Sequence, residues 1–264
     1  MKPLHYLVLN ILSLLFTLYI NFLGGTGIGL ENSVGEISRD YATLITPAAY
    51  AFSIWGLIYF LLILFVIFQG YGYFKNSTEN SLSPSGIWFF LANISNALWI
   101  FAWTGEHLLI SVLVILFLLF TLIRLTILLK LEIWDAPIRV IVFVWWPICI
   151  YTGWIILATV LNISVWLESI GLLEGTWSHE GWAVSVIVLA TLLYSFLIRE
   201  RNMREAAMVG IWGFIAIAVS QWDGQFMVLL AALIGSFFLF IQICRHGWRN
   251  IATSPIMKYK RGEI

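Results

Sequence analysis

Residues 145–166 read WWPICIYTGWIILATVLNISVW, and this stretch decides the fold class of the chain. It is apolar enough to cross a bilayer as a helix, since a span needs roughly 20 mainly apolar residues. Residues four apart share a helix face, so Trp154, Ala158 and Asn162 form one stripe. An amide in hydrocarbon needs a hydrogen-bond partner, and a small side chain permits close approach. The stripe therefore predicts either a helix-packing surface or one wall of a ligand pocket.

The composition of the whole chain extends this interpretation. The sequence is 61% hydrophobic and only 11% charged, with a mean hydropathy of +0.94. Soluble domains do not have such values. We therefore predict an all-α, polytopic transmembrane helix bundle, with spans at about 4–23, 47–69, 86–104, 107–130, 138–162, 181–198, 205–222 and 225–244.

The Lys and Arg residues predict an orientation, because cytoplasmic loops of membrane proteins accumulate them. With the N-terminus inside, 13 of the 14 Lys and Arg residues lie in or beside inner segments, and Arg39 is the exception. We expect both termini in the cytoplasm and membrane lipid as the surrounding partner. The two cysteines, Cys149 and Cys244, fall in or beside apolar segments, so we expect packing residues rather than a metal site or a disulfide.

The residue pattern of the stretch 145–166 resembles that of a known family. Tyr151, Trp154, Ala158, Leu161 and Asn162 stand at the spacing of the fifth transmembrane helix of the TspO/MBR family. These are the tryptophan-rich sensory proteins related to the mitochondrial translocator protein. Leu157 takes the place of the usual phenylalanine.

Two further segments resemble the same family. Its second helix opens with proline and continues Phe-x-x-Trp-x-x-x-Tyr, matched here by Pro47, Phe52, Trp55 and Tyr59. Its third helix is similar to the segment NALWIFAW, which begins at Asn96. The resemblance implies a TspO-like five-helix core over 1–168, and leaves 169–264 as about three additional C-terminal transmembrane helices with a basic cytoplasmic tail.

The first loop, residues 24–46, departs from the family pattern. Family members carry tryptophans and a Trp-x-Pro-Pro run there, whereas this loop has no Trp and offers only Pro47, followed by Ala48. Its length and its glycines suit either a lid over the bundle or a disordered connector.

The resemblance implies a function. A pocket among the first five helices would bind a flat hydrophobic ligand of the porphyrin or haem type, with a sensory, regulatory or ligand-handling role. Indole faces offer stacking surfaces, and the amides could orient polar substituents. The residues expected to bind the ligand are Trp55, Tyr59, Asn96, Trp99, Trp154, Ala158 and Asn162.

Other classes of function remain open from the sequence. The alternative is a transporter of small solutes or lipid-like molecules, because eight spans exceed what a five-helix receptor needs, although no repeat and no acidic residue in the middle of a span supports it. A membrane enzyme lacks a His cluster or a nucleophile–base pair, so we expect no enzyme, with weak light-dependent porphyrin breakdown as a property that the resemblance implies. We also expect no required cofactor, no metal and no nucleic acid, a homodimer by resemblance, and a location in the bacterial inner membrane.

Overall fold

The computed structural model describes residues 3–75, 81–173, 178–251 and 255–262. Within these ranges every regular element is helical. The elements are α1 (Pro3–Thr26), α2 (Val34–Asp40), the 3-10 turn η1 (Ala49–Ser53), α3 (Ile54–Phe74), α4 (Leu82–Ser85), α5 (Trp88–Thr104), α6 (Leu108–Leu128), α7 (Ile138–Val140), the π-helical turn η2 (Ile141–Trp145), α8 (Trp146–Ser169), α9 (His179–Arg201), α10 (Arg204–Ser220), α11 (Phe226–Arg249) and α12 (Pro255–Lys260).

The all-α prediction is confirmed, and a helix stands at each of the eight predicted ranges. Six of the helices are long and apolar enough to cross a membrane, while α5 and α10 are shorter, with 17 residues each. The observed ends differ from the predicted ones. The helix predicted to end at 162 continues to Ser169, and the Ser164 and Ser169 hydroxyls of this last part donate to backbone carbonyls of the same helix.

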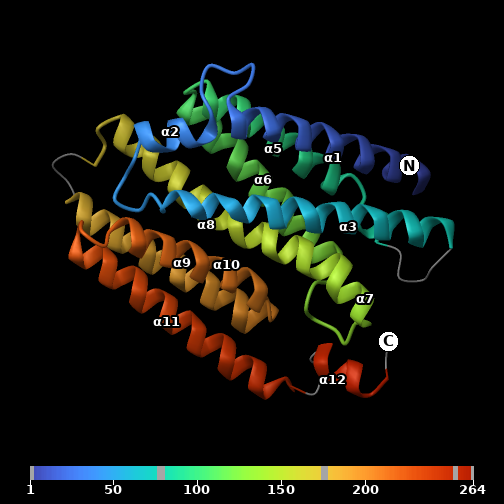
Figure 1. The fold of residues 1–264 in the computed structure, drawn as a ribbon. Coiled ribbons are helices and arrows are strands. Elements are labelled where there is room, and N and C mark those ends of the chain that lie inside the picture. The colour runs from blue at the N-terminus through green and yellow to red at the C-terminus, as the bar shows by residue number, and fades with distance from the viewer. Residues whose placement is uncertain (1–2, 76–80, 174–177, 252–254, 263–264) are drawn as a thin grey trace.

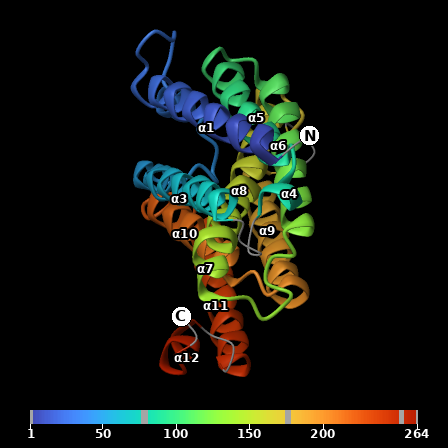
Figure 2. The ribbon, with the colours of Figure 1, turned by 90° about the vertical axis from the view of Figure 1, so that its right-hand side faces the viewer.

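Helix α8, which contains all of the stretch 145–166 except Trp145, is the centre of the bundle. Figures 1 and 2 show it in the middle, with α1, α5 and α6 on one side and α9, α10 and α11 on the other. Its residues Tyr151 and Trp154 are 1% exposed. An apolar helix without a polar face has no reason to lie at a surface in contact with water, and this one is enclosed by its neighbours.

Small residues let the C-terminal helices approach α8 closely. A Cβ atom at Gly153 would lie 2.6 Å from the carbonyl oxygen of Ala206 on α10. The Tyr194 hydroxyl on α9 donates a hydrogen bond of 2.7 Å to the carbonyl oxygen of Gly153. Membrane helices associate largely through such close packing and hydrogen bonds, because lipid supplies little hydrophobic driving force between them. The helices α9 and α10 are thus packed firmly on the centre of the bundle.

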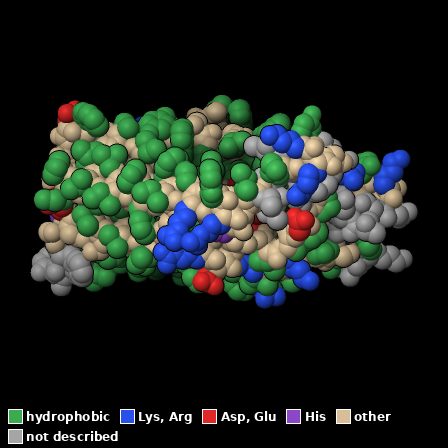
Figure 3. All heavy atoms as spheres, turned by 90° about the horizontal axis from the view of Figure 1, so that it is seen from below, with side chains coloured by type: hydrophobic (Ala, Val, Ile, Leu, Met, Phe, Trp, Pro, Cys, Tyr) green, Lys and Arg blue, Asp and Glu red, His purple; other side chains and the backbone are tan. Residues whose placement is uncertain are grey.

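The outer surface is suited to lipid. Large apolar side chains are exposed along α1, α3, α6, α9 and α11, for example Leu15, Phe60 and Phe237. Figure 3 shows hydrophobic side chains over most of one face and Lys and Arg side chains gathered toward the end where α11 finishes. The chain is an integral, multi-pass membrane protein.

Candidate functional site

An aromatic cluster joins α3 and α8 at the centre of the bundle. The ring of Trp55 stacks on Tyr59, with centroids 5.3 Å apart, and meets Trp154 edge-on at 6.1 Å. Tyr151 also lies edge-on to Trp55 at 6.1 Å, and Phe52 contacts Trp154 in the same manner. Aromatic residues four apart on one helix share a face, so the spacings predicted from each helix become contacts between helices.

A cavity of about 440 Å³ lies against this cluster. Phe52, Trp55, Tyr59 and Trp99 form its aromatic wall. Its remaining lining comes from the ends of α1 and α5, from the segment before η1 and from α2, and consists of Asn21, Gly25, Val34, Gly35, Ser38, Arg39, Ala42, Thr46, Pro47, Ala49 and Ile100.

A smaller cavity of about 50 Å³ adjoins the first and shares Phe52, Trp55 and Trp99 with it. The predicted stripe of Trp154, Ala158 and Asn162 lines this second space. Five of the seven predicted residues therefore surround the smaller cavity, and Tyr59 joins the wall of the larger one. The small side chain of Ala158 leaves the space that a larger residue would fill.

The side-chain amides of Asn96 and Asn162 form hydrogen bonds with other side chains of the protein. Asn162 accepts a hydrogen bond of 2.8 Å from the Trp99 indole and donates one of 2.8 Å to Ser111. Asn96 lies behind the cavities, where it accepts from Asn21 and donates to the Tyr151 hydroxyl at 3.0 Å. In this arrangement both amides hold the aromatic walls in place.

Two buried polar atoms beside the cavities have no protein partner. Within the described residues, the Tyr59 hydroxyl and the Trp154 indole nitrogen make no hydrogen bond. An unsatisfied buried donor costs about 1–3 kcal/mol. Such atoms next to a cavity fit a ligand that supplies an acceptor.

The first loop is folded over the opening of the cavities. Ser33 caps α2 by accepting from the backbone N–H of Glu36, and the Glu36 carboxylate accepts from the N–H of Ser33. These hydrogen bonds hold the pKa of Glu36 below its ordinary value. The Tyr41 hydroxyl donates to Glu106 at 2.7 Å, and the Trp103 indole donates to the Val34 carbonyl. The loop is therefore ordered, which disagrees with a disordered connector, and its segment 33–41, called the lid below, contributes to the lining of the larger cavity.

Helix α10 holds the base of the lid. The backbone N–H of Ala48 donates to the carbonyl of Ala216 at 3.0 Å. Ser220 and Gln221 donate to carbonyls of the segment before η1, and Trp212 donates to the carbonyl of Ala51. The C-terminal helices thus position the start of α3, on which Trp55 and Tyr59 stand.

Arg39 is a cavity residue that sequence reasoning did not select. It is on α2 and lines the larger cavity, where it provides a fixed positive charge. Its position as the one basic residue on the predicted outer side was a signal that could have singled it out. Lid residues such as Ser38 carried no comparable signal, because small polar residues are common in every loop.

A family model described as TSPO-like protein matches residues 7–245. The chain belongs to the TSPO-like family. The match of the TSPO-like model runs from α1 into α11, so it includes the C-terminal helices that hold the lid as well as the aromatic cluster. The comparisons with curated proteins and with solved structures returned no match.

Proposed function

We propose that this TSPO-like membrane protein binds a flat hydrophobic ligand, a porphyrin or haem-type tetrapyrrole, in the cavities beneath α2. The observation that carries the proposal is the pair of adjoining cavities walled by Trp55, Trp99 and Trp154. The larger cavity, at about 440 Å³, falls within the range of roughly 300–1,000 Å³ that is typical of small-molecule sites.

The chemistry of the walls favours a flat ligand with acidic substituents. Indole and phenol faces on Trp55 and Tyr59 provide stacking surfaces. The guanidinium of Arg39 suits a carboxylate at the opening of the cavity, because its planar fork can donate two parallel hydrogen bonds. The free indole N–H of Trp154 would donate to a polar atom of the ligand.

The lid supports a ligand-handling or sensory role. Segment 33–41 is anchored to the bundle by the buried side chain of Ile37 and by a few hydrogen bonds, among them the exposed one from Tyr41 to Glu106. Such contacts are weak enough to break when a ligand enters. A change in the lid on binding would be the signal that a partner reads.

We also propose the bacterial inner membrane as the location, with both termini in the cytoplasm. Figure 1 shows the two ends of the chain at the same end of the bundle. The same end holds the Lys- and Arg-rich segments, which favours the cytoplasmic side for it.

Titration of the purified protein with protoporphyrin IX tests the proposal, with quenching of tryptophan fluorescence as the readout. We expect saturable quenching in the parent protein. The affinity should fall about tenfold or more in Trp55→Phe and in Trp154→Phe, since each variant loses part of a stacking surface or a hydrogen-bond donor. Trp248→Phe is the matched control, because Trp248 is 81% exposed and stands at the end of α11 that lies away from the lid. Equal affinities of all three variants would contradict the proposed site.

A further inference from the structure

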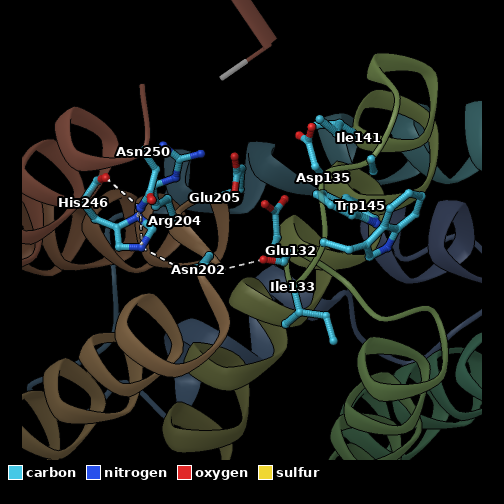
Figure 4. Close-up of a pocket in the computed structure, with 12 residues that line it drawn as sticks. Glu132, Ile133, Asp135, Ile141, Trp145, Asn202, Arg204, Glu205, His246 and Asn250 are labelled. Carbon is cyan, nitrogen blue, oxygen red and sulfur yellow. Dashed lines mark hydrogen bonds between the residues drawn. The ribbon is translucent and has the colours of Figure 1, made fainter. Parts of the chain in front are cut away.

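A third cavity, which is polar, lies at the opposite end of the bundle from the lid. Its volume is about 240 Å³, and its lining includes Glu132, Glu205, Arg204, Trp145 and His246. Figure 4 shows the two glutamates in the middle, Arg204 and His246 on one side and Trp145 on the other. None of these residues belongs to the aromatic cavities.

Two connections of the chain, α6–α7 and α9–α10, meet the last part of α11 here, and Asn202 hydrogen-bonds to both neighbours. This residue has a left-handed backbone, φ 57°, between α9 and α10. Its amide donates to the carbonyl of Glu132 at 2.7 Å, and its amide oxygen lies 2.8 Å from Nε2 of His246 on α11. A non-glycine residue with positive φ is uncommon and persists where the surroundings hold it. Glu132 itself also has a positive φ, 59°, so two residues in the left-handed region are joined by a hydrogen bond in this wall.

The walls carry both acceptors and donors that lack a partner. Among the residues that the structure describes, Oε1 of Glu132 and Oε2 of Glu205 are buried and accept no hydrogen bond. The Nε–H of Arg204 and the indole N–H of Trp145 are buried and find no acceptor. Buried polar atoms of native proteins are nearly all paired. Four unpaired atoms around one cavity therefore point to a ligand with donors on one side and acceptors on the other.

Trp145 is the most enclosed of these groups, with 3% of its surface exposed. It ends the π-helical turn η2, two residues before Pro147 in the first turn of α8. Proline has no N–H to continue the helical hydrogen bonds, and a single π turn of this kind is frequent at functional sites. The ring of Trp134 meets Trp145 edge-on at 5.8 Å, so the cavity has an aromatic wall beside its carboxylates.

The electrostatics of the cavity favour a positive group near the glutamates. Burial and the neighbouring Glu205 carboxylate raise the pKa of Glu132 to about 8, although Arg204 opposes the shift. A positive group of a ligand beside Glu132 could replace the proton and offset the repulsion between the Glu132 and Glu205 carboxylates. Carboxylates pair with ammonium groups through charge-assisted hydrogen bonds, which are stronger than neutral ones.

We propose that this cavity binds a small zwitterion that carries an ammonium group and an anionic oxygen group. The ammonium donates to Oε1 of Glu132 and Oε2 of Glu205. The anionic oxygens accept from Nε of Arg204 and Nε1 of Trp145. The same chemistry occurs in a free solute and in the phosphoethanolamine headgroup of a lipid, and the cavity lies at the ends of membrane helices, where either can reach it.

The experiment has two arms. In the first, the full-length protein in detergent is titrated calorimetrically with O-phosphoethanolamine, and with ethanolamine and inorganic phosphate as single-charge probes. In the second, the protein is placed in nanodiscs of phosphatidylcholine alone or mixed with phosphatidylethanolamine, and retained lipid is measured by native mass spectrometry. Phosphatidylcholine is the matched lipid, because its quaternary ammonium has no N–H to donate.

We expect saturable binding of O-phosphoethanolamine if the source is a free solute, or retention of phosphatidylethanolamine over phosphatidylcholine if it is a lipid. Either signal should fall about tenfold or more in Glu132→Gln and in Glu205→Gln, since each replaces an ionic acceptor by an amide of equal size. Trp145→Phe, which keeps the ring and removes the donor, should also weaken it. Glu200→Gln, at an exposed position near the same end of α9, should not.

Three results would overturn the proposal. The first is the absence of a signal in both arms, which would mean that water fills the cavity. The second is binding that Glu132→Gln and Glu205→Gln leave unchanged while both variants keep the helical circular dichroism of the parent. The third is equal affinity for ethanolamine and O-phosphoethanolamine, because the anionic half would then contribute nothing.

Discussion

The contact between α8 and α10 at Gly153 allows a quantitative test of the packing. A Cβ atom there would lie 2.6 Å from the carbonyl oxygen and 2.8 Å from the Cα of Ala206. Real Cβ atoms do not approach other heavy atoms this closely, and both obstacles are backbone atoms. Gly153→Ala must therefore move α10 away from α8, because no side chain can rotate out of the way.

The expected cost follows from two opposing effects. Overpacking of this kind destabilises by about 1–3 kcal/mol. Because both obstacles are backbone atoms, the upper part of this range applies, about 2–3 kcal/mol. Alanine in place of glycine within a helix returns up to about 1 kcal/mol. The net loss is then about 1–2 kcal/mol, which corresponds to a fall in melting temperature of roughly 2–8 °C for a chain of this size. The hydrogen bond from Tyr194 to the Gly153 carbonyl would weaken with the same movement.

Thermal unfolding of the detergent-purified protein, followed by circular dichroism, measures the effect. Gly56→Ala is the matched control, because it adds the same methyl group to a helix where a Cβ meets nothing within 4 Å. We expect the control to melt at or slightly above the temperature of the parent. If Gly153→Ala melts together with Gly56→Ala, the close contact of α8 with α10 is not a determinant of stability and the reasoning fails.

Two further predictions concern buried polar groups. Asn162→Leu should lower the melting temperature, because it leaves the Trp99 indole and Ser111 without their partner at a cost of about 1–3 kcal/mol; an unchanged melting temperature would mean that the network contributes nothing. For Glu132 the pKa is about 8 in the folded protein against 4.5 for an ordinary glutamate, so the folded state holds the extra proton between these values. Stability should therefore fall as pH rises from about 4.5 to about 8. The melting temperature, measured over this pH range, should depend less on pH in Glu132→Gln than in the parent. An equal pH dependence in both proteins would contradict the raised pKa of Glu132, which Glu205 and Arg204 also influence.

The positions of the helices could be predicted because each is encoded locally. A run of about 20 apolar residues can satisfy its backbone in lipid only as a helix, and this reasoning located all eight long helices. The residues at which these helices end are not encoded in the same local way. The span predicted to end at 162 continues as a helix to Ser169, because apolar content indicates how much of a helix lies in lipid and not where its backbone hydrogen bonds stop.

The sequence by itself determined the membrane environment, the helical class and the aromatic stripe of Trp154 and Ala158, since composition and a period of 3.6 residues are properties of short segments. Only the tertiary structure decided that α2 covers the cavities, that α10 anchors the start of α3, and that Glu132, Trp145 and Arg204 surround one cavity. The physical reason is that periodicity tells which residues share a face of one helix. Which faces meet depends on long-range packing, on close contacts such as Gly153 with Ala206, and on hydrogen bonds between segments far apart in the chain.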